Sequence, residues 1–579
     1  MITRQRRLLI DSVLLGVVGA ISARVFVFLL SWSQRFFLGW IGRYQPPALA
    51  IDSGLSGVVT AAHGLWWIPL STTLGGLLAG MIVYLWAPEA EGHGTDAAVQ
   101  AFHHLKGIIR SRVPFIKLIA SAITIGSGGS AGREGPTALI SAGIASIYAK
   151  KTHRTEQEAR LLLLIGMAAG LSAIFRSPIG TAIFAVEVLY SEVEFESRAL
   201  IFTLLGSIVA YAVNGLFVGF RPLFAVPATL SPPGASDYGW YAVLGIACGV
   251  IGTVLPMALY GVRDLFRKIP CPPHCKPAIA GCMVGLVAVA FPQLLGGGYS
   301  WIQAAIDGNL PATLLFCLVF GKILTFALTI GSGGSGGVFA PSLFTGAMLG
   351  GFLSPIFHQP PAAFAVVGMA AVFASAARVP IATLLMVTSM TGGYHLLVAA
   401  ALAVLLSYLV QSLLSSHLKY KSLYEAQVPR RSDSPSHYLE QVRIALEMTR
   451  RPGFAASLDG QALGLIELLN SGVPINVIEG KQMRIGALRP DSPCVGQKIE
   501  SACLGQSQDV EIILILRGNT VFWPKSAPKL QGGDRVIAVT SEAAWAQLSE
   551  QFEQGGSAGH PASRASHETH TPARETTLP

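Results

Sequence analysis

Charged residues are scarce in this chain. Asp, Glu, Lys and Arg together make up 13% of its 579 residues, against about 25% in typical soluble domains. Hydrophobic residues account for 51%, and the mean hydropathy is +0.53. A soluble protein of this length needs a polar shell, and a disordered chain has far fewer apolar residues. Both classes are excluded, and the composition is that of a polytopic membrane protein.

Cysteine is scarce too. The seven cysteines are odd in number and lack a framework spacing, which excludes a secreted disulfide scaffold. The short run from Cys271 to Cys275 has no second ligand pair nearby, so we expect no metal site. We recognise no nucleotide-binding loop and no nucleophile beside a base, so we expect neither a cofactor nor an enzyme. The net charge of +9 fits anionic lipid and the positive-inside rule better than nucleic acid.

The remaining charges are unevenly placed. Arg4, Arg6 and Arg7 precede an apolar run over 8–30, which predicts a first spanning helix in the cell membrane with a cytoplasmic N-terminus. Several later apolar segments are too short to cross roughly 30 Å of hydrocarbon at about 1.5 Å per residue. Short segments of this kind are typical of transporters and channels with broken helices. The later segments cover 68–87, 115–125, 137–149, 161–190, 199–219, 239–260, 277–293, 311–330, 341–357, 362–391 and 394–416.

An internal repeat supports this interpretation. The heptapeptide TIGSGGS occupies 124–130 and recurs at 329–335, 205 positions later. A second pattern, GMAA followed by Arg-x-Pro-Ile, spans 166–179 and recurs over 368–381. We therefore predict an all-α membrane fold built from two internal, inverted repeats with broken helices, although the spacing alone does not set their direction. The binding site of such a fold lies where the repeats meet.

The composition changes after Tyr424. We expect a membrane domain over 1–428, a charged linker over 429–454, a small α+β domain over 455–552 and a disordered tail over 553–579. Both chain ends are then cytoplasmic. The clearest elements predicted in the α+β domain are strands over 510–516 and 535–540 and a helix-like stretch over 541–552.

The loops that follow the repeated heptapeptides are suited to an anion. In the first repeat, Gly132-Arg133-Glu134-Gly135-Pro136 opens an apolar helix, and in the second Gly336–Pro341 does the same. A proline in the first turn leaves the preceding glycine-rich amides without partners at a partly positive helix end. Two such ends would hold a dehydrated anion without a full positive charge, which would bind it too tightly for passage.

Glu134 is unusual because a carboxylate inside a membrane is costly unless it has a function or a partner. As an anion itself, it could occupy the place of the permeant ion and leave on protonation. The alternative is a capping glutamate paired with the adjacent Arg133. For Phe339, at the start of the second helix, a core aromatic and a functional residue remain equally open.

The motifs GSGGSAGREGP at 126–136 and GSGGSGGVFAP at 331–341 resemble those of the CLC family of chloride channels and chloride/proton exchangers. The resemblance covers about 8–428. It implies that Glu134 is the gate, that the backbone amides of Val338 and Phe339 line the central anion site, and that the hydroxyl of Tyr424 donates to the ion. Arg133 is counted with the anion-binding residues, and the transported ion is chloride. The family also implies a homodimer in the lipid bilayer with one pathway per subunit.

The chain departs from the family pattern at His93, which stands between Gly92 and Gly94 where the family commonly has an ion-coordinating serine. An imidazole N–H can donate to chloride, and the ring can carry a charge near neutral pH. Alternatively, the backbone amides of this segment bind the ion and His93 faces water. The choice among chloride, nitrate and similar small anions stays open.

A second departure lies at the end of 180–189, which resembles a family helix that carries two consecutive glutamates in typical exchangers. Here the pair is Glu187-Val188, and Val188 cannot relay a proton. This favours a passive channel, with a chloride/proton antiporter as the alternative. In that case protons would enter through water or through three glutamates that are otherwise a solvated loop face: Glu192, Glu194 and Glu196.

The soluble region from about 484 to 548 resembles the C-terminal regulatory module of potassium-transport regulators, of the TrkA-C type (the RCK C-terminal domain). Binding of an unknown small ligand and dimerisation without a ligand are both open. A subunit of a potassium transport system is a remote alternative, because no TVGYG-like filter is present.

Overall fold

The computed structural model divides the chain into two compact units, 1–436 and 437–579, which we treat separately. Most of the predicted linker, residues 455–474 and the predicted tail lie outside the described residues. The structure describes residues 2–47, 65–227, 230, 232–431, 434, 475–478, 481–497, 510–517, 520–522, 529–549 and 552.

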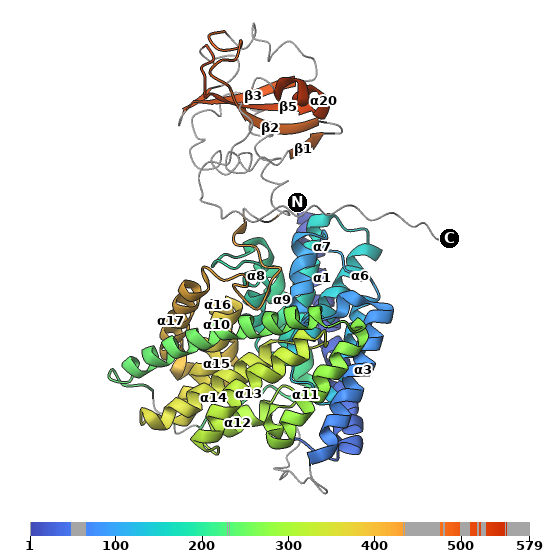
Figure 1. Cartoon of the computed structure of the whole chain (residues 1–579), viewed down its shortest axis with the longest axis vertical. Helices are drawn as coiled ribbons and strands as arrows, with labels where there is room; N and C mark the ends of the chain where they lie inside the picture. Colours follow the sequence, from blue (N-terminus) through green and yellow to red (C-terminus); the bar gives the residue numbers. More distant parts are fainter. Residues whose placement is uncertain are drawn as a thin grey trace. The chain divides into compact units, whose positions relative to one another are not determined.

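The first unit is all-helical, and within its described residues nine helices are long and apolar enough to span a membrane. Helices of unequal length cross at steep inclinations, as α10 and α1 show in Figure 1. The first half contains α1 (Ile2–Gln34), α3 (Ile68–Trp86), α4 (Thr95–His103), α5 (Val113–Gly126), α6 (Glu134–Lys151), α7 (Glu156–Phe175), α8 (Pro178–Glu187) and α9 (Ser197–Val218). The second half contains α10 (Tyr238–Lys268), α11 (Lys276–Ala290), α12 (Tyr299–Ile306), α13 (Ala312–Gly331), α14 (Phe339–Ile356), α15 (Pro361–Ala377), α16 (Pro380–Thr391) and α17 (Leu397–Ser415).

The two halves repeat the same packing. Helix α1 packs against α5, α7 and α9, and α10 packs against their counterparts α13, α15 and α17. Equivalent helices of the two halves also meet, since α3 packs on α11 and α8 on α16. Contacts between equivalent elements are what a pseudo-two-fold relation produces, so the predicted duplication and the helical fold class are confirmed.

Two apolar stretches of the sequence, 161–190 and 362–391, each contain two helices. The breaks fall at Arg176 and Arg378, which have left-handed φ values of 55° and 57° and end α7 and α15. A proline two residues later starts the next helix. Left-handed arginine is strained, and both side chains are anchored. Arg176 donates to the carbonyl of Arg221 at 3.0 Å, and Arg378 donates to Ser415 at 2.8 Å.

The second unit contains an antiparallel five-stranded sheet with the order β1-β2-β5-β3-β4 and a short helix. The predicted α+β class is confirmed, whereas the TrkA-C resemblance stays a prediction. The predicted helix is shorter than expected, because the chain leaves it after Leu548 and Phe552 stacks on Trp545 beside Leu488. The elements are β1 (Ile475–Ile478), β2 (Lys481–Ala487), β3 (Val510–Arg517), β4 (Thr520–Phe522), β5 (Arg535–Ser541) and α20 (Glu542–Leu548).

Candidate anion pathway

The two repeats touch at equivalent glycines. The amide of Gly132 donates to the carbonyl of Gly337 at 2.8 Å, and the amide of Gly337 donates back at 2.7 Å. This antiparallel bridge joins the loops that lead into α6 and α14. It therefore brings the first turns of these two helices together at the centre of the unit.

Close backbone packing at this point requires glycine. A Cβ added at Gly135 would overlap the carbonyl oxygen of His93 and lie 3.0 Å from Cα of Gly337. Gly94, which has a φ of 84°, also packs closely, since a Cβ added there would lie 2.6 Å from the carbonyl oxygen of Gly135. The segment 92–94 is thus held against the start of α6.

Backbone donors at both helix starts lack protein acceptors. Among the described residues, the amides of Arg133 and Glu134 in the first repeat and of Val338 and Phe339 in the second have no hydrogen-bond acceptor. Helix N-termini concentrate partial positive charge, and amides of this kind bind anions. The arrangement gives two partly positive helix ends that can stabilise one dehydrated anion between them.

Glu134 lies at the first of these helix ends. Its side chain is 1% exposed, and both carboxylate oxygens are buried without a hydrogen-bond partner in the described residues. A Cβ at Gly132 would overlap Oε2, so the carboxylate lies over this glycine next to the bridge between the repeats.

The alternative of a capping glutamate paired with Arg133 is not supported by an ion pair between the two side chains. The Arg133 guanidinium instead lies over the ring of Tyr299, 4.7 Å from its centroid. No ion pair joins the two residues within the described part of the chain. A buried carboxylate without a partner is costly, which favours a functional role for Glu134.

His93 and Tyr424 lie together. The two side chains are 8% and 2% exposed, and their ring centroids are 5.5 Å apart. Nδ1 of His93 is buried and has no partner among the described residues. The alternative in which His93 faces water is therefore wrong, and its ring lies beside the tyrosine that the resemblance assigned to the anion.

Two buried lysines support the loops, and we did not single them out in the sequence. Lys117 Nζ donates to the carbonyls of Ala90 and Gly92 at 3.0 and 2.6 Å. Lys322 Nζ donates to those of Leu294 and Gly296 at the same two distances. Their 205-residue separation, equal to that of the heptapeptides, was the available signal.

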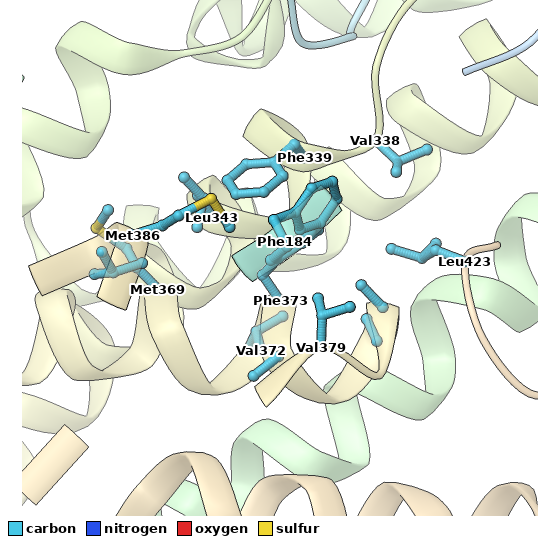
Figure 2. Packing of buried hydrophobic residues seen from close by; sticks show 14 of the residues in the cluster. Phe184, Val338, Phe339, Leu343, Met369, Val372, Phe373, Val379, Met386 and Leu423 are labelled. Carbon is cyan, nitrogen blue, oxygen red and sulfur yellow. The ribbon is translucent and has the colours of Figure 1, made fainter. Parts of the chain in front are cut away.

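The side chain of Phe339 belongs to the hydrophobic core. Its ring packs against Phe175, Phe184 and Phe373, with centroid distances of 4.3, 6.1 and 3.8 Å. Figure 2 shows Phe184, Phe339 and Phe373 of this cluster, with Leu343 and Met386 beside them. Of the two interpretations of this side chain, the core aromatic is confirmed, and only the backbone of Phe339 is available to an ion.

Comparisons with known proteins agree with this architecture. A family model described as "Voltage gated chloride channel" matches residues 75–412, more than half of the chain. The chain belongs to the CLC family. It is 30% identical over 388 residues to proteins named H(+)/Cl(-) exchange transporter ClcA from Salmonella agona and Salmonella arizonae, covering 64% of this chain and 81% of each relative.

Two solved CLC structures share the fold. A slow cyanobacterial Cl⁻/H⁺ antiporter matches 72% of this chain and 95% of its own, with a TM-score of 0.60 and 24% identity. A CLC-type fluoride/proton antiporter matches 73% and 96%, with a TM-score of 0.59 and 23% identity. At these identities the likeness shows the fold alone.

In this CLC chain the acid at the end of α8, Glu187, is hydrogen-bonded to the other repeat, and the next residue is an apolar valine. Val188 is fully buried, and its carbonyl accepts from Gln427 at 3.0 Å. The Glu187 carboxylate accepts from the amides of Ile381 and Ala382, at 3.1 and 2.7 Å. Glu187 therefore caps α16 of the other repeat.

The three glutamates after α8 are bound to the chain that leaves the membrane unit. Arg430 pairs with Glu192 at 2.6 Å, while Arg431 pairs with Glu196 at 3.1 Å and its amide donates to Glu194 at 2.5 Å. The solvated loop face expected from the sequence therefore holds for Glu192, whose side chain is 49% exposed, but not for Glu196, which is buried.

The segment that contains Arg430 and Arg431 also contacts α4. Ser434 Oγ lies 2.7 Å from His103 Nδ1, and Nε2 of the same imidazole lies 3.0 Å from the carbonyl of Leu189. We call the described residues 428–431 and 434 the attachment segment.

Proposed function

We propose that this multi-pass membrane protein conducts chloride or a similar small anion between the starts of α6 and α14. The feature that carries the proposal is Glu134, a buried carboxylate without a partner beside backbone donors without acceptors. Anion and carboxylate compete for these donors, so protonation of Glu134 opens the pathway. The amides of Val338 and Phe339, the flanking segment Gly92–Gly94 and the side chains of His93, Arg133 and Tyr424 complete the anion-binding set.

We further propose passive conduction. Coupled exchange needs a proton route to Glu134 that is separate from the anion, and such a route requires titratable groups or water. Val188 supplies no proton site, Glu187 is used in capping α16, and the glutamates beyond α8 are paired with Arg430 and Arg431.

A proton-coupled exchanger is the second candidate function. It is favoured by the names of the relatives, which are H(+)/Cl(-) exchange transporters, and by the titles of the two antiporter structures. Water could then replace the missing side chain at position 188.

The reversal potential of purified protein in a planar bilayer separates the two functions. With a chloride gradient and equal pH, both give an anion-selective potential. When a pH gradient is added at constant chloride, we expect no shift for passive conduction. A shift toward the proton equilibrium potential contradicts the passive proposal and establishes exchange.

The gate itself is tested with Glu134→Gln. Glutamine cannot ionise and so competes poorly with the anion, and we expect basal flux from liposomes to rise about tenfold at neutral pH, the effect of removing roughly 1.4 kcal/mol of competition. The increase of flux on acidification should also flatten. Glu89→Gln, at an exposed acid paired with Arg110, is the matched control. Unchanged flux in Glu134→Gln would count against the gate.

We also propose a homodimer in the cell membrane with both chain ends in the cytoplasm, and a regulatory role for the C-terminal unit. Large apolar side chains on α9 and α17 are exposed, including Ile201 at 71%, Leu216 at 80% and Leu413 at 75%. Cross-linking of single-cysteine variants on α9 and α17 in native membranes tests the dimer, and labelling of terminal cysteines tests the orientation.

A further inference from the structure

Tyr424 lies in a stretch of chain, residues 420–426, that forms neither a helix nor a strand. We call it the Tyr424 segment. Within it, Leu423 belongs to the hydrophobic core, at the edge of the cluster in Figure 2, and its amide donates to the carbonyl of Ala376 at 2.9 Å. Because the segment has no regular secondary structure, the direction of the Tyr424 side chain depends on contacts that the neighbouring residues make with other elements.

One face of α10 contacts the first half of the segment. Tyr260 and Asp264 are four positions apart, so their side chains lie on the same side of the helix. The Tyr260 hydroxyl donates to the carbonyl of Leu423 at 2.8 Å, and the Tyr260 ring stacks on Tyr420 with a centroid distance of 4.4 Å. Asp264 accepts from the Tyr420 hydroxyl at 3.1 Å. The chain just before Tyr424 is therefore fixed to α10.

Arg263, on the same face of α10, reaches the residue directly after Tyr424. Its Nη1 donates to Oε2 of Glu425 at 2.6 Å, and its Nη2 donates to Oε1 at 3.4 Å and to the Tyr420 hydroxyl at 3.1 Å. An exposed ion pair contributes little by itself, and the Glu425 side chain is 48% exposed. The guanidinium, however, is 19% exposed and lies over the Tyr260 ring, 4.4 Å from its centroid, so it has little freedom left to lose. Arg263 therefore connects the chain on both sides of Tyr424 to one helix.

Asp96 contacts the end of the segment from α4. Its Oδ1 accepts from the amide of Ala426 at 2.8 Å, and a carboxylate binds an amide more strongly than a neutral acceptor does. Asp96 lies in the first turn of α4, three residues after His93. Two short stretches of chain thus join the same carboxylate to His93 and to Tyr424, whose ring centroids lie 5.5 Å apart.

The stiffness of this attachment matters for selectivity. Donors on a rigid frame favour the ion whose size matches them, whereas donors on a mobile segment adapt to several ions. The Tyr424 segment is fastened to α10 at Tyr420, Leu423 and Glu425 and to α4 at Ala426. It therefore belongs to the rigid kind.

We propose that Arg263 and Asp96 are positioning residues that keep the Tyr424 hydroxyl at a fixed place beside His93 and so set the selectivity among small anions. They act through the tyrosine rather than by touching the ion. The selectivity statement rests on the proposed anion conduction, whereas the positioning statement does not.

Positioning is measured by hydrogen–deuterium exchange of the peptide that contains Ala426, in the full-length protein in detergent. Asp96→Ala removes the acceptor of the Ala426 amide, and we expect its exchange to become about tenfold faster. Asp96→Asn keeps an acceptor oxygen and should stay within about threefold of the native rate. Arg263→Gln should also accelerate the exchange, and Arg267→Gln, at a 66% exposed arginine one turn further along α10, is the control. Native exchange rates in both Asp96→Ala and Arg263→Gln overturn the proposal.

Selectivity is measured as the ratio of nitrate to chloride flux from liposomes. In Arg263→Gln we expect the ratio to rise about twofold, because a loosened tyrosine admits the larger ion more easily. Arg263→Lys keeps the charge but not the planar fork, and its ratio should lie between those of the native protein and Arg263→Gln. In a Tyr424→Phe background, Arg263→Gln should change the ratio no further, because the hydroxyl that it positions is gone. An equal rise in both backgrounds contradicts action through Tyr424, and an unchanged ratio with faster exchange contradicts a role in selectivity.

The elution volume in size-exclusion chromatography confirms that each variant is folded. If Arg263→Gln does not fold, Glu425→Gln weakens the same pair from its more exposed partner and should show both changes; native exchange and a native ratio in that variant overturn the role of the pair. If the native protein conducts no anion, the proposed function fails by itself. The exchange measurements then still decide whether Arg263 and Asp96 position the Tyr424 segment.

Discussion

The two repeats of the membrane unit have the same backbone frame but different side chains at its centre. Each has a buried lysine that binds two loop carbonyls, and each contributes one glycine to the bridge between Gly132 and Gly337. Glu134 of the first repeat corresponds to Phe339 of the second, and Arg133 corresponds to Val338. His93 similarly corresponds to Gly297.

This comparison distinguishes the residues that form the proposed anion site from the residues that are proposed to control access to it. The glycines and lysines are shared, and so are the equivalent serines Ser130 and Ser335. Each serine contacts a hydroxyl group of the other repeat, Ser335 that of Ser121 at 2.8 Å and Ser130 that of Thr325 at 3.1 Å. Arg133, Glu134 and His93 of the first repeat, in contrast, are replaced by uncharged residues in the second. Duplication therefore supplies two helix ends, and divergence places the proposed gate, Glu134, on one of them and the core aromatic Phe339 on the other.

Substitutions in the backbone frame that the two repeats share should cause the largest loss of stability. In Gly135→Ala the new Cβ overlaps the carbonyl oxygen of His93, a backbone atom that cannot move away easily. We expect a loss of more than about 3 kcal/mol in the free energy of unfolding, as for other severe core overlaps. Gly261→Ala, where a Cβ meets nothing within 4 Å, is the control. Similar melting temperatures for both variants in detergent would contradict the close packing.

The buried lysines Lys117 and Lys322 make equivalent contacts in the two repeats, but only Lys117 contacts the segment that contains His93. Lys117→Met and Lys322→Met each leave two carbonyls without their donor, and we expect each to lower the unfolding free energy by about 2 kcal/mol. Only Lys117 holds the segment that contains His93, so anion flux at equal protein should fall more in Lys117→Met. Equal flux in both variants would show that the segment needs no such support.

The pair Glu134 and Phe339 tests whether equivalent positions have different roles. Phe339→Leu removes part of a packed ring, and we expect a cost of about 1.5 kcal/mol in unfolding free energy. Phe373→Leu, in the same cluster, should cost a similar amount. Unlike Glu134→Gln, Phe339→Leu should not raise basal flux in liposomes; an increase comparable to that of the glutamate variant would assign gating to the aromatic ring.

The smallest effect is expected at His93, where the second repeat has glycine. His93→Ser keeps a hydrogen-bond donor and leaves more room beside Tyr424, so larger anions should gain relative to chloride. We expect the nitrate-to-chloride flux ratio to rise about twofold, or roughly 0.4 kcal/mol of discrimination. His104→Ser, at an exposed position directly after α4, is the control. An unchanged ratio would show that His93 does not shape the anion site.

The sequence was sufficient to predict the duplication and the starts of the helices, because exact motifs such as TIGSGGS recur and a proline marks the first turn of a helix. It was not sufficient for the breaks at Arg176 and Arg378, since left-handed arginine is held by tertiary contacts that no local pattern reveals. The direction of the Arg133 side chain was equally hidden, because its partner Tyr299 is far along the chain. Lys117 and Lys322 could have been identified from the sequence, because they are lysines in apolar stretches and are separated by the repeat distance of 205 residues.

The attachment segment has a mechanical consequence. It begins four residues after Tyr424, and its contacts to Glu192, Glu196 and His103 connect it to the turn after α8 and to the helix that follows His93. The described chain beyond Tyr424 is therefore fastened at two places, the turn after α8 and the C-terminal end of the helix that follows His93, so substitutions that loosen this segment would release both places together.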